Sequence, residues 1–473
     1  MNWTQLLCRE RERPHSSNNE NEIRTEFRRD YHRIIGSASF RRLQDKAQVY
    51  PLMRGDFVRT RLTHSLEVSS FAESLGDMIF RRLELPDSQI REDCCDILRC
   101  AGLIHDIGNP PFGHFGEFAI RRWFKENLPR LKFNGKPVSE LLGEQMRADF
   151  LNFEGNAQAL RIITRLHCLT DMSTGMNLTY ALLNTIIKYP VFSVDIDKKS
   201  GDIRTKKMGC FYSENELFEK ITNATGAGKC RYPLTFILEA ADDIAYLTAD
   251  IEDAVVKGFI DFRTLSEELN SGARDYIDAP GGFYETIRGA ADSLSENYEE
   301  AFKLCMPDPK QKAVQQWVVK LQNMLIYAAA DSFCDNYEAI MNGTFKTALL
   351  TASDAQGVAK MLGDIAYKYA FRSKSVVSSE ISEQTIMKSL LDNIVDMALN
   401  FGLEDSSGFH TDLSEVLSEN YVAICRNKCK DASESEQCYY RIQLATDCIS
   451  GMTDSYAEKF YRMLNGFGDQ RYV

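Results

Sequence analysis

The chain has 473 residues, 44% of them hydrophobic and 26% charged, which suffices for a large buried core in one domain or two closely packed ones. Its 56 basic and 68 acidic residues give a formal net charge of −12. That balance argues against a general nucleic-acid coat, although a local basic patch remains compatible with it. No apolar run approaches membrane-spanning length, and the polar, charged N-terminus does not resemble a signal peptide. We therefore expect a soluble, cytoplasmic protein.

Thirteen cysteines are scattered along the chain, and none forms a Cys-x-x-Cys pair. Three lie on one expected helix, between positions 94 and 100, and three more lie between 425 and 438. In a reducing compartment such cysteines are mostly buried thiols. We expect buried thiols here rather than a zinc site.

The first part of the chain divides into a polar segment, residues 1–20, and a series of helical patterns. An apolar thread at helical spacing predicts a helix over 22–40, after which the pattern becomes extended around 44–51. Helical patterns resume through residue 84 and again from about 88 to 107. The second of these leads into the most informative stretch of the sequence.

That stretch runs from residue 101 to 117, where an apolar helix face ends in the adjacent pair His105-Asp106. Gly108 and the two prolines after Asn109 cannot continue the helix, so the pair lies where a packed helix stops. His114 and Glu117 follow, three residues apart, and share a face if the segment turns helically. Side chains that bind metals or transfer protons are therefore concentrated within thirteen residues.

Two other segments supply companions to this pair. His64 begins an amphipathic helix whose apolar positions place it near the buried side. An almost wholly apolar helix expected over 233–256 carries Asp242 and Asp243, and a buried carboxylate needs a cation nearby. Two imidazoles and two carboxylates form a mixed nitrogen and oxygen set that suits Mn, Fe, Co, Ni or Mg better than a closed structural zinc site.

The order His…His-Asp…Asp resembles the metal-dependent HD phosphohydrolase superfamily. Longer strings are similar to the bacterial dGTP triphosphohydrolases within it; they occupy residues 40–49, 59–68, 102–117, 153–158 and 239–246, with a further echo at 449–457. The resemblance implies an all-α fold: an HD-domain helical bundle with an additional C-terminal helical layer and a small strand or loop insert. We expect the polar segment 1–20, a phosphohydrolase core over 21–262 and a helical region over 263–473 packed on that core.

The resemblance also assigns residues to the reaction centre. It implies a divalent ion, Mn or Mg first, held by His64, His105, Asp106 and Asp242, and it selects Asp242 over Asp243. It implies that His114 is the general acid/base and that Glu117 orients and tunes its imidazole. Without the resemblance, His114 would be interpreted as a satisfied core histidine.

Further residues match substrate-binding positions, each with a plainer alternative. Lys188, Tyr189 and Lys207 are expected at the phosphates, with Arg61 a further candidate, although lysines usually form a solvated face. The sugar side is expected to contain Gln48, Val49, Tyr246 and Asp250. Tyr246 would stack beneath the ribose and reject a 2′-hydroxyl, while Asp250 and Gln48 would meet the 3′-hydroxyl.

Elsewhere the expectations are less specific. A helix is expected to open at Leu151, where Glu154 and Asn156 could be only capping residues, and a polar strand-like or loop insert is expected between Asn184 and Gly209. Arg441 is the candidate that reads the base; its alternative is a surface charge on an amphipathic helix. Helical patterns continue over 311–341, 354–371, 380–401, 412–428 and 434–464.

The predicted activity is hydrolysis of dGTP, or other dNTPs, to the deoxynucleoside and tripolyphosphate. The resemblance also implies a homo-oligomer, a hexamer foremost, and an effector site for a dNTP or single-stranded DNA. Two alternatives stay open: another HD-family nucleotide phosphohydrolase, such as a monophosphatase or phosphodiesterase, and a non-catalytic nucleotide sensor.

Overall fold

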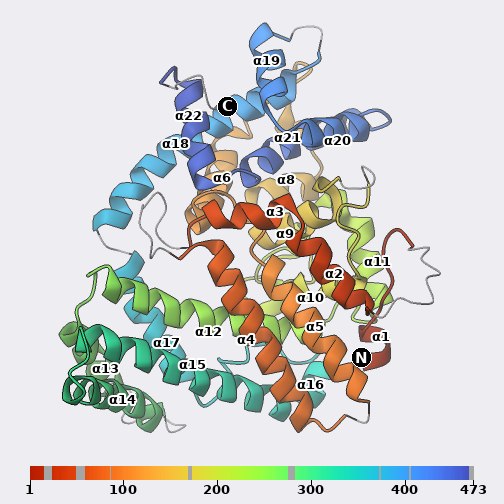
Figure 1. Ribbon diagram of the computed structural model, residues 1–473. Helices are drawn as coiled ribbons and strands as arrows, with labels where there is room; N and C mark the ends of the chain where they lie inside the picture. Colours follow the sequence, from red (N-terminus) through yellow and green to blue (C-terminus); the bar gives the residue numbers. More distant parts are fainter. Residues whose placement is uncertain are drawn as a thin grey trace.

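The computed structural model describes residues 1–14, 24–48, 59–85, 87–168, 173–274, 283–371, 374–403 and 406–467. Over these residues the protein is built almost entirely from helices (Figure 1). Within these described ranges, the only sheet is a hairpin of two short antiparallel strands, β1 (Lys132–Phe133) and β2 (Lys136–Pro137). The predicted all-α class is therefore confirmed. None of the described helices combines the length and apolar character needed to cross a membrane.

The α-helices are α1 (Trp3–Leu6), α2 (Glu26–Ile35), α3 (Ala38–Arg42), α4 (Arg61–Arg82), α5 (Ser88–Ile104), α6 (Gly113–Asn127), α7 (Val138–Leu141), α8 (Glu144–Leu151), α9 (Gly155–Arg161), α10 (Tyr180–Ile186), α11 (Asn215–Ala224), α12 (Pro233–Val256), α13 (Phe262–Arg274), α14 (Phe283–Lys303), α15 (Pro309–Asp335), α16 (Tyr337–Met341), α17 (Gln356–Ala366), α18 (Lys374–Asn400), α19 (Gly408–Val416), α20 (Glu419–Cys429), α21 (Glu434–Ser450) and α22 (Asp454–Leu464). Short 3-10 turns are η1 (Leu43–Asp45), η3 (Ser193–Asp195), η4 (Ile203–Thr205) and η5 (Tyr212–Glu214), and single π-helical turns are η2 (Ile162–Leu166) and η6 (Tyr367–Phe371).

Helices α4 and α5 form the closest pair in the centre of the fold (Figure 1). Thr60 begins α4 with a capping box, in which its hydroxyl accepts from the Thr63 amide and the Thr63 hydroxyl accepts from the Thr60 amide. Gly102 lets α5 approach α4 at backbone distance, because a Cβ there would lie 2.5 Å from the Ser69 Cα. This approach brings the first turn of α4 to the end of α5.

Helix α12 lies across α4 and also packs against α5, α15 and α17. Pro233 occupies its first turn, where a missing amide hydrogen costs nothing, and its interior contains no glycine or proline to interrupt it. Most of its residues are buried, including Asp250 and Asp253, and Asp242 and Asp243 are partly buried. The C-terminal half thus packs on the N-terminal core through α15 and α17.

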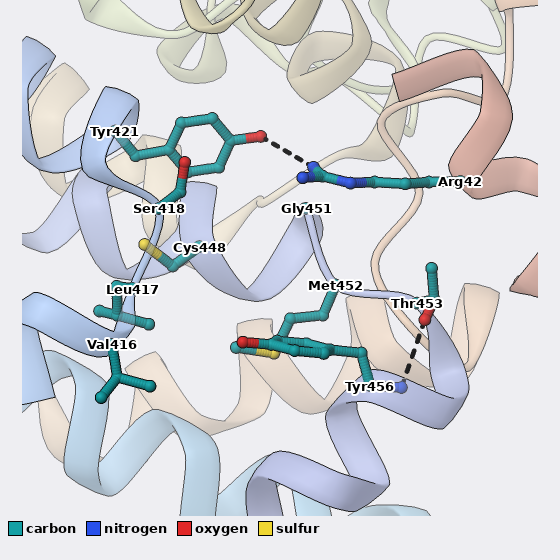
Figure 2. Close-up of a pocket in the computed structure, with 10 residues that line it drawn as sticks. All are labelled: Arg42, Val416, Leu417, Ser418, Tyr421, Cys448, Gly451, Met452, Thr453 and Tyr456. Atoms are coloured by element: carbon teal, nitrogen blue, oxygen red, sulfur yellow. Dashed lines mark hydrogen bonds between the residues drawn. The ribbon is translucent and has the colours of Figure 1, made fainter. Parts of the chain in front are cut away.

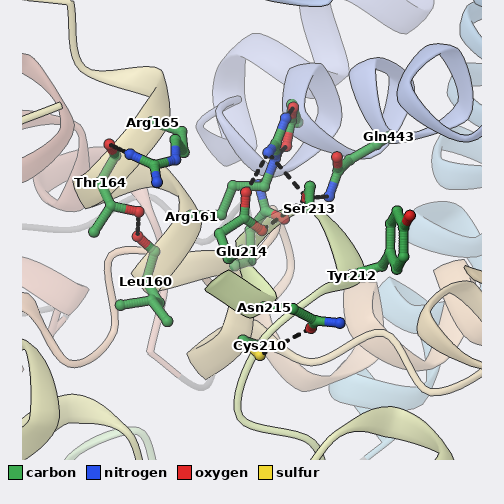
Figure 3. A network of polar contacts seen from close by, with 12 residues as sticks. Leu160, Arg161, Thr164, Arg165, Cys210, Tyr212, Ser213, Glu214, Asn215 and Gln443 are labelled. Atoms are coloured by element: carbon green, nitrogen blue, oxygen red, sulfur yellow. Dashed lines mark hydrogen bonds and ion pairs between the residues drawn. The ribbon is translucent and has the colours of Figure 1, made fainter. Parts of the chain in front are cut away.

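A buried ionic network also joins the two parts (Figure 3). Arg161, at the end of α9, donates from Nε and Nη2 to both carboxylate oxygens of Asp447 on α21, at 2.8 and 2.7 Å, and from Nη1 to Glu214 at 2.7 Å. Gln158 adds a bond of 2.9 Å to Asp447. Burial alone would lower the pKa of Arg161, but these two carboxylates raise it. The network attaches α21 to α9 and η5.

Three expectations about local structure need correction. The helix expected over 22–40 is two helices, since Gly36 ends α2 and Ser37 caps α3. The patterns over 412–428 and 434–464 each contain a break, at 417–418 and at 451–453; at the second break the Thr453 hydroxyl caps α22 by accepting from the Tyr456 amide. The insert between Asn184 and Gly209, expected to be strand-like or a loop, is a loop with 3-10 turns and so agrees with the second alternative; the one described strand pair lies at 132–137.

Candidate active site

The predicted metal ligands come from three elements that meet inside the fold. His64 lies in the first turn of α4, His105 caps the C-terminal end of α5, Asp106 follows it, and Asp242 lies in the middle of α12. Donor atoms of His64, His105 and Asp106 all lie within 4.8 Å of one another. The Asp242 Oδ1 lies 3.1 Å from His64 Nε2 and 3.4 Å from His105 Nε2. The structure therefore brings all four residues together.

The chemistry of these donors fits a divalent ion. His105 Nδ1 lies 2.8 Å from the Gly102 carbonyl oxygen, which only accepts, so Nδ1 carries the proton and Nε2 presents its lone pair. That Nε2 is buried and is hydrogen-bonded by none of the described residues. It lies 3.5 Å from Asp106 Oδ1 and 3.4 Å from Asp242 Oδ1. Two imidazoles and two carboxylates converge on one point, as a divalent ion requires.

Asp106 is held by two donors as well as by the cluster. Arg61, one turn before His64 on α4, donates to Asp106 Oδ2, and Asn109 Nδ2 donates to Oδ1 at 2.7 Å. Burial would raise the pKa of Asp106, but His105 and Arg61 outweigh it and lower that pKa. The carboxylate is thus ionised and oriented. Arg61, predicted at the phosphates, makes its described contact with this metal-site carboxylate.

Asp242 and its neighbour Asp243 have different environments. Lys188 Nζ donates to Asp242 Oδ2 at 2.7 Å, and although burial opposes it, this lysine with His105 lowers the Asp242 pKa well below its usual value. Burial, together with Glu239 and Asp242, raises the pKa of Asp243 to about 8. Asp242 is therefore the charged member of the pair, and it is the one directed at the imidazoles.

His114 and Glu117 occupy the first turns of α6, directly after the loop that follows His105-Asp106. His114 Nδ1 lies 3.7 Å from Glu117 Oε2, and 82% of the His114 side chain is exposed, whereas Glu117 is buried. Glu117 Oε1 accepts from the Gly155 amide at 2.8 Å. Burial would raise the pKa of Glu117, but the nearby His114 imidazole and the charge of Lys207 lower it to about 2. A fixed, ionised carboxylate thus faces an imidazole that is open to solvent.

The predicted phosphate-binding residues border this region. Lys188 bridges to Asp242, Tyr189 is buried next to it, and Lys207 Nζ lies 2.7 Å from Glu154 Oε2. Glu154 is at the N-cap position of α9 but caps no backbone amide, so its side chain serves Lys207 and Asn156 instead. Glu154 adjoins Gly155, whose amide donates to Glu117, and the positive charge of Lys207 helps to lower the pKa of Glu117.

The predicted sugar-side residues follow the same face of α12. Tyr246 is partly buried one turn after Asp242, and Asp250 is buried one turn further, with Oδ2 hydrogen-bonded by none of the described residues. Burial raises the Asp250 pKa well above its usual value. The Gln48 Oε1 is likewise buried and unpartnered among described residues. Val49 lies outside the residues that the structure describes.

Arg441 is engaged in the C-terminal region. Its Nη1 donates to the carbonyls of Ala398 and Phe401, at 3.0 and 2.9 Å, and its guanidinium lies over the Phe401 ring at 4.7 Å from the centroid. These contacts close the C-terminal end of α18. Its role at the base stays a prediction.

A cavity of about 410 Å³ lies apart from these residues, against the segment that joins α21 to α22 (Figure 2). Arg42, Tyr421 and Tyr456 line it, and Arg42 Nη1 donates to the Tyr421 hydroxyl at 3.4 Å. None of the predicted site residues contributes to its wall. The candidate site is therefore defined by the histidine and aspartate cluster and its borders, where ligand-binding side chains converge, and not by this cavity.

Comparison with known proteins agrees with this geometry. The HD domain family matches residues 61–188, a range that contains His64, His105, Asp106 and His114 and ends at Lys188. A deoxyguanosinetriphosphate triphosphohydrolase-like protein of Listeria innocua is 41% identical over 478 residues, covering 98% of this chain and 100% of that protein. A probable deoxyguanosinetriphosphate triphosphohydrolase of Pseudomonas aeruginosa is 33% identical over 92% of each chain. A deoxyguanosinetriphosphate triphosphohydrolase of Serratia proteamaculans is 32% identical over 96% of each chain.

An all-helical protein with this histidine and aspartate cluster inside an HD domain is a metal-dependent phosphohydrolase. Within that class, the similarity over almost the full length of the chain identifies the family. The chain belongs to the deoxyguanosinetriphosphate triphosphohydrolase family of HD-domain enzymes.

Proposed function

We propose that this enzyme hydrolyses dGTP to deoxyguanosine and tripolyphosphate, with other dNTPs as secondary substrates. The observation that carries the proposal is the convergence of two buried histidines, His64 and His105, with the partly buried Asp106 and Asp242. Lys188 borders this set, and Tyr246 and Asp250 continue from it along α12. The substrate class follows from the activity named for the relatives in Pseudomonas and Serratia.

The four-residue set would hold one divalent ion, for which we propose Mn or Mg. Bound there, the ion would supply positive charge at the α-phosphate and activate a water molecule. Arg61 and Asn109 keep Asp106 ionised and oriented, and Lys188 does the same for Asp242. These three donors would keep the two carboxylates in position while charge develops on the substrate phosphate during the reaction.

His114 is proposed to deliver a proton to the departing 5′-oxygen of the deoxynucleoside. Water adds to the α-phosphorus, the bond from phosphorus to the 5′-oxygen breaks, and the two products are deoxyguanosine and tripolyphosphate. Glu117, ionised and fixed by the Gly155 amide, stabilises the protonated imidazole and restrains its orientation. The exposure of His114 lets its proton be replaced from solvent after each turnover.

Lys188, Tyr189 and Lys207 are proposed to bind the triphosphate. A substrate phosphate would compete with Glu154 for Lys207, because the ion pair of 2.7 Å must open or be shared. Tyr246 would lie against the deoxyribose and leave no room for a 2′-hydroxyl. Asp250, whose pKa is raised by burial, is suited to donate to the 3′-hydroxyl as well as to accept from it.

Product analysis tests the reaction. The purified protein is incubated with each dNTP and Mn²⁺ or Mg²⁺, alone and with the other dNTPs, and the products are separated by ion-exchange chromatography. Deoxyguanosine with tripolyphosphate in equal amounts is the expected result. Release of orthophosphate or pyrophosphate would instead indicate a different HD-family phosphohydrolase. Nucleotide binding without turnover in any mixture would indicate a sensor. Light scattering in the same buffers tests the hexamer that we propose for the assembly.

A further inference from the structure

Asp454, the first residue of α22, contacts both segments that carry the reaction centre. Its Oδ1 accepts from the Phe112 amide at 2.9 Å, and its Oδ2 accepts from the Ala47 amide at 2.8 Å. Phe112 is the N-cap of α6, which carries His114. Ala47 pairs with Thr60, the N-cap of α4, which carries Arg61 and His64. One buried carboxylate from the far end of the chain therefore links the starts of both helices.

Lys46 makes a second link beside the first. Its buried Nζ donates to the Asn109 carbonyl at 2.6 Å and to the Ser450 carbonyl at 2.7 Å. Asn109 belongs to the loop between the His105-Asp106 pair and His114, and its own side chain donates to Asp106. Ser450 ends α21. The loop is thus joined to the C-terminal region at Asn109 and at Phe112.

The conformation of this loop needs such support. Phe112 has a φ of 64°, in the left-handed region that residues other than glycine and asparagine rarely adopt. The Phe112 side chain does not cap α6. Gly113, which follows, also has a positive φ, and a Cβ there would lie 2.5 Å from Arg61 Nη2. Strained backbone persists only where surrounding contacts determine it. The Asp454 carboxylate is the contact that fixes the Phe112 amide.

We propose that Asp454 and Lys46 form a brace that positions His114 relative to the metal ligands, so that the C-terminal segment 450–454 governs turnover without touching substrate. The brace acts through backbone atoms: Asp454 binds the Phe112 amide of the loop and the Ala47 amide, and Lys46 binds the Asn109 carbonyl of the loop and the Ser450 carbonyl. It rests on the proposed role of His114. Asp454 and Lys46 are positioning residues, because their contacts are to backbone atoms and not to the reacting groups.

The test variant is Asp454→Asn, which keeps the size of the side chain but places an amide against one of the two backbone donors. The expected result is a fall in kcat of about 10- to 100-fold with KM for dGTP changed less than threefold and metal content unchanged. Amide hydrogen exchange should quicken in peptides covering 107–116 and stay unchanged in those covering α5. Lys46→Met should change the same quantities in the same direction, and it carries the test if Asp454→Asn does not fold.

Ser455→Ala is the matched control. Ser455 donates to Asp45 at 2.8 Å, so it also joins α22 to the segment before α4, but among the described residues its side chain makes no hydrogen bond to the loop or to α6. Its kcat and exchange pattern should equal those of the unmodified protein.

Two results would overturn the brace. In one, a folded Asp454→Asn or Lys46→Met protein keeps both its kcat and its exchange pattern. In the other, kcat falls, KM rises and metal content falls together, which would show that the residue has only a general structural role. If the unmodified protein does not turn over dGTP, the proposed function fails, while metal content and hydrogen exchange still decide whether the brace exists.

Discussion

Replacing Arg161 with methionine should destabilise the protein strongly, because it would leave two carboxylates without their buried cation. Methionine has a similar volume, so the change creates little cavity and isolates the ionic contribution. The arginine makes three charge-assisted bonds of 2.7 to 2.8 Å to Asp447 and Glu214, and its side chain is 7% exposed. Removing one partner from a buried ion pair costs about 3–5 kcal/mol. Gln158 still donates to Asp447 in the variant, so we expect the lower end, about 3 kcal/mol.

Urea denaturation followed by circular dichroism and tryptophan fluorescence measures this effect. Trp3, Trp123 and Trp317 are all buried, so their emission reports loss of packing. Arg122→Met is the matched control, since Arg122 pairs with Glu126 at 2.9 Å on the exposed face of α6. An exposed pair of this kind contributes about 0.2–1 kcal/mol. The Arg161 variant should therefore unfold at a clearly lower urea concentration than the Arg122 variant.

Equal urea midpoints for the Arg161→Met and Arg122→Met proteins would refute the reasoning.

A double variant distinguishes the effect of an unpaired buried charge from the effect of lost packing. Asp447→Leu combined with Arg161→Met removes a carboxylate together with its cation, so the double variant should lose less stability than the sum of the two single changes. An additive double variant would show that the ionic network of Figure 3 is not the source of the loss.

Four further predictions concern the site and its surroundings. Asp106→Ala should lose bound metal and activity together, measured by elemental analysis and dGTP turnover; full metal content would contradict its assignment as a ligand. His114→Ala should keep metal and nucleotide binding but lower kcat by about 100-fold or more, and near-normal turnover would exclude it as the acid. Tyr246→Ala should reduce discrimination between dGTP and GTP, measured as the ratio of kcat/KM values. Glu383→Gln tests a buried carboxyl whose pKa is raised to about 8, chiefly by burial and then by Asp454. Between about pH 4.3 and 8 the unfolded chain ionises Glu383 while the native protein keeps it protonated, so the unmodified protein loses stability as pH rises. The variant should therefore gain relative stability by about 1.4 kcal/mol per pH unit in that window, and a constant difference would refute this.

Much of the site was accessible from sequence because its signals are local. The His105-Asp106 pair at the end of an apolar helix, and His114 and Glu117 one turn apart, depend on spacing within one segment. The helix 233–256 was also predictable, since proline begins it and apolar residues continue without a breaker. Choosing Asp242 over Asp243 required more than spacing: the resemblance made the choice, and the contacts of Asp242 with the two imidazoles and Lys188 give its physical basis.

Other residues could not be assigned because their partners are distant in sequence. Lys46 and Asp454 belong to strings that resemble the family, yet neither string shows that one residue binds the Asn109 carbonyl and the other the Phe112 amide. Arg61 was expected at the phosphates, but its described contact is with Asp106. The sequence does not show which residue a charged side chain will pair with, because the partner depends on which opposite charge the packed helices bring close to it.

By itself, the sequence indicated the helices and the residue types at the metal cluster, because helical periodicity and local spacing can be recognised along the chain. Its resemblance to a known family predicted the all-α class and the type of reaction. The tertiary structure decided how these parts meet. It set α4 against α5 through Gly102, directed Asp242 rather than Asp243 at the imidazoles, and brought the C-terminal Asp454 to the loop before His114. Such contacts join residues far apart in sequence, and only the packing of buried surfaces determines which of the many available partners lie close enough to bind.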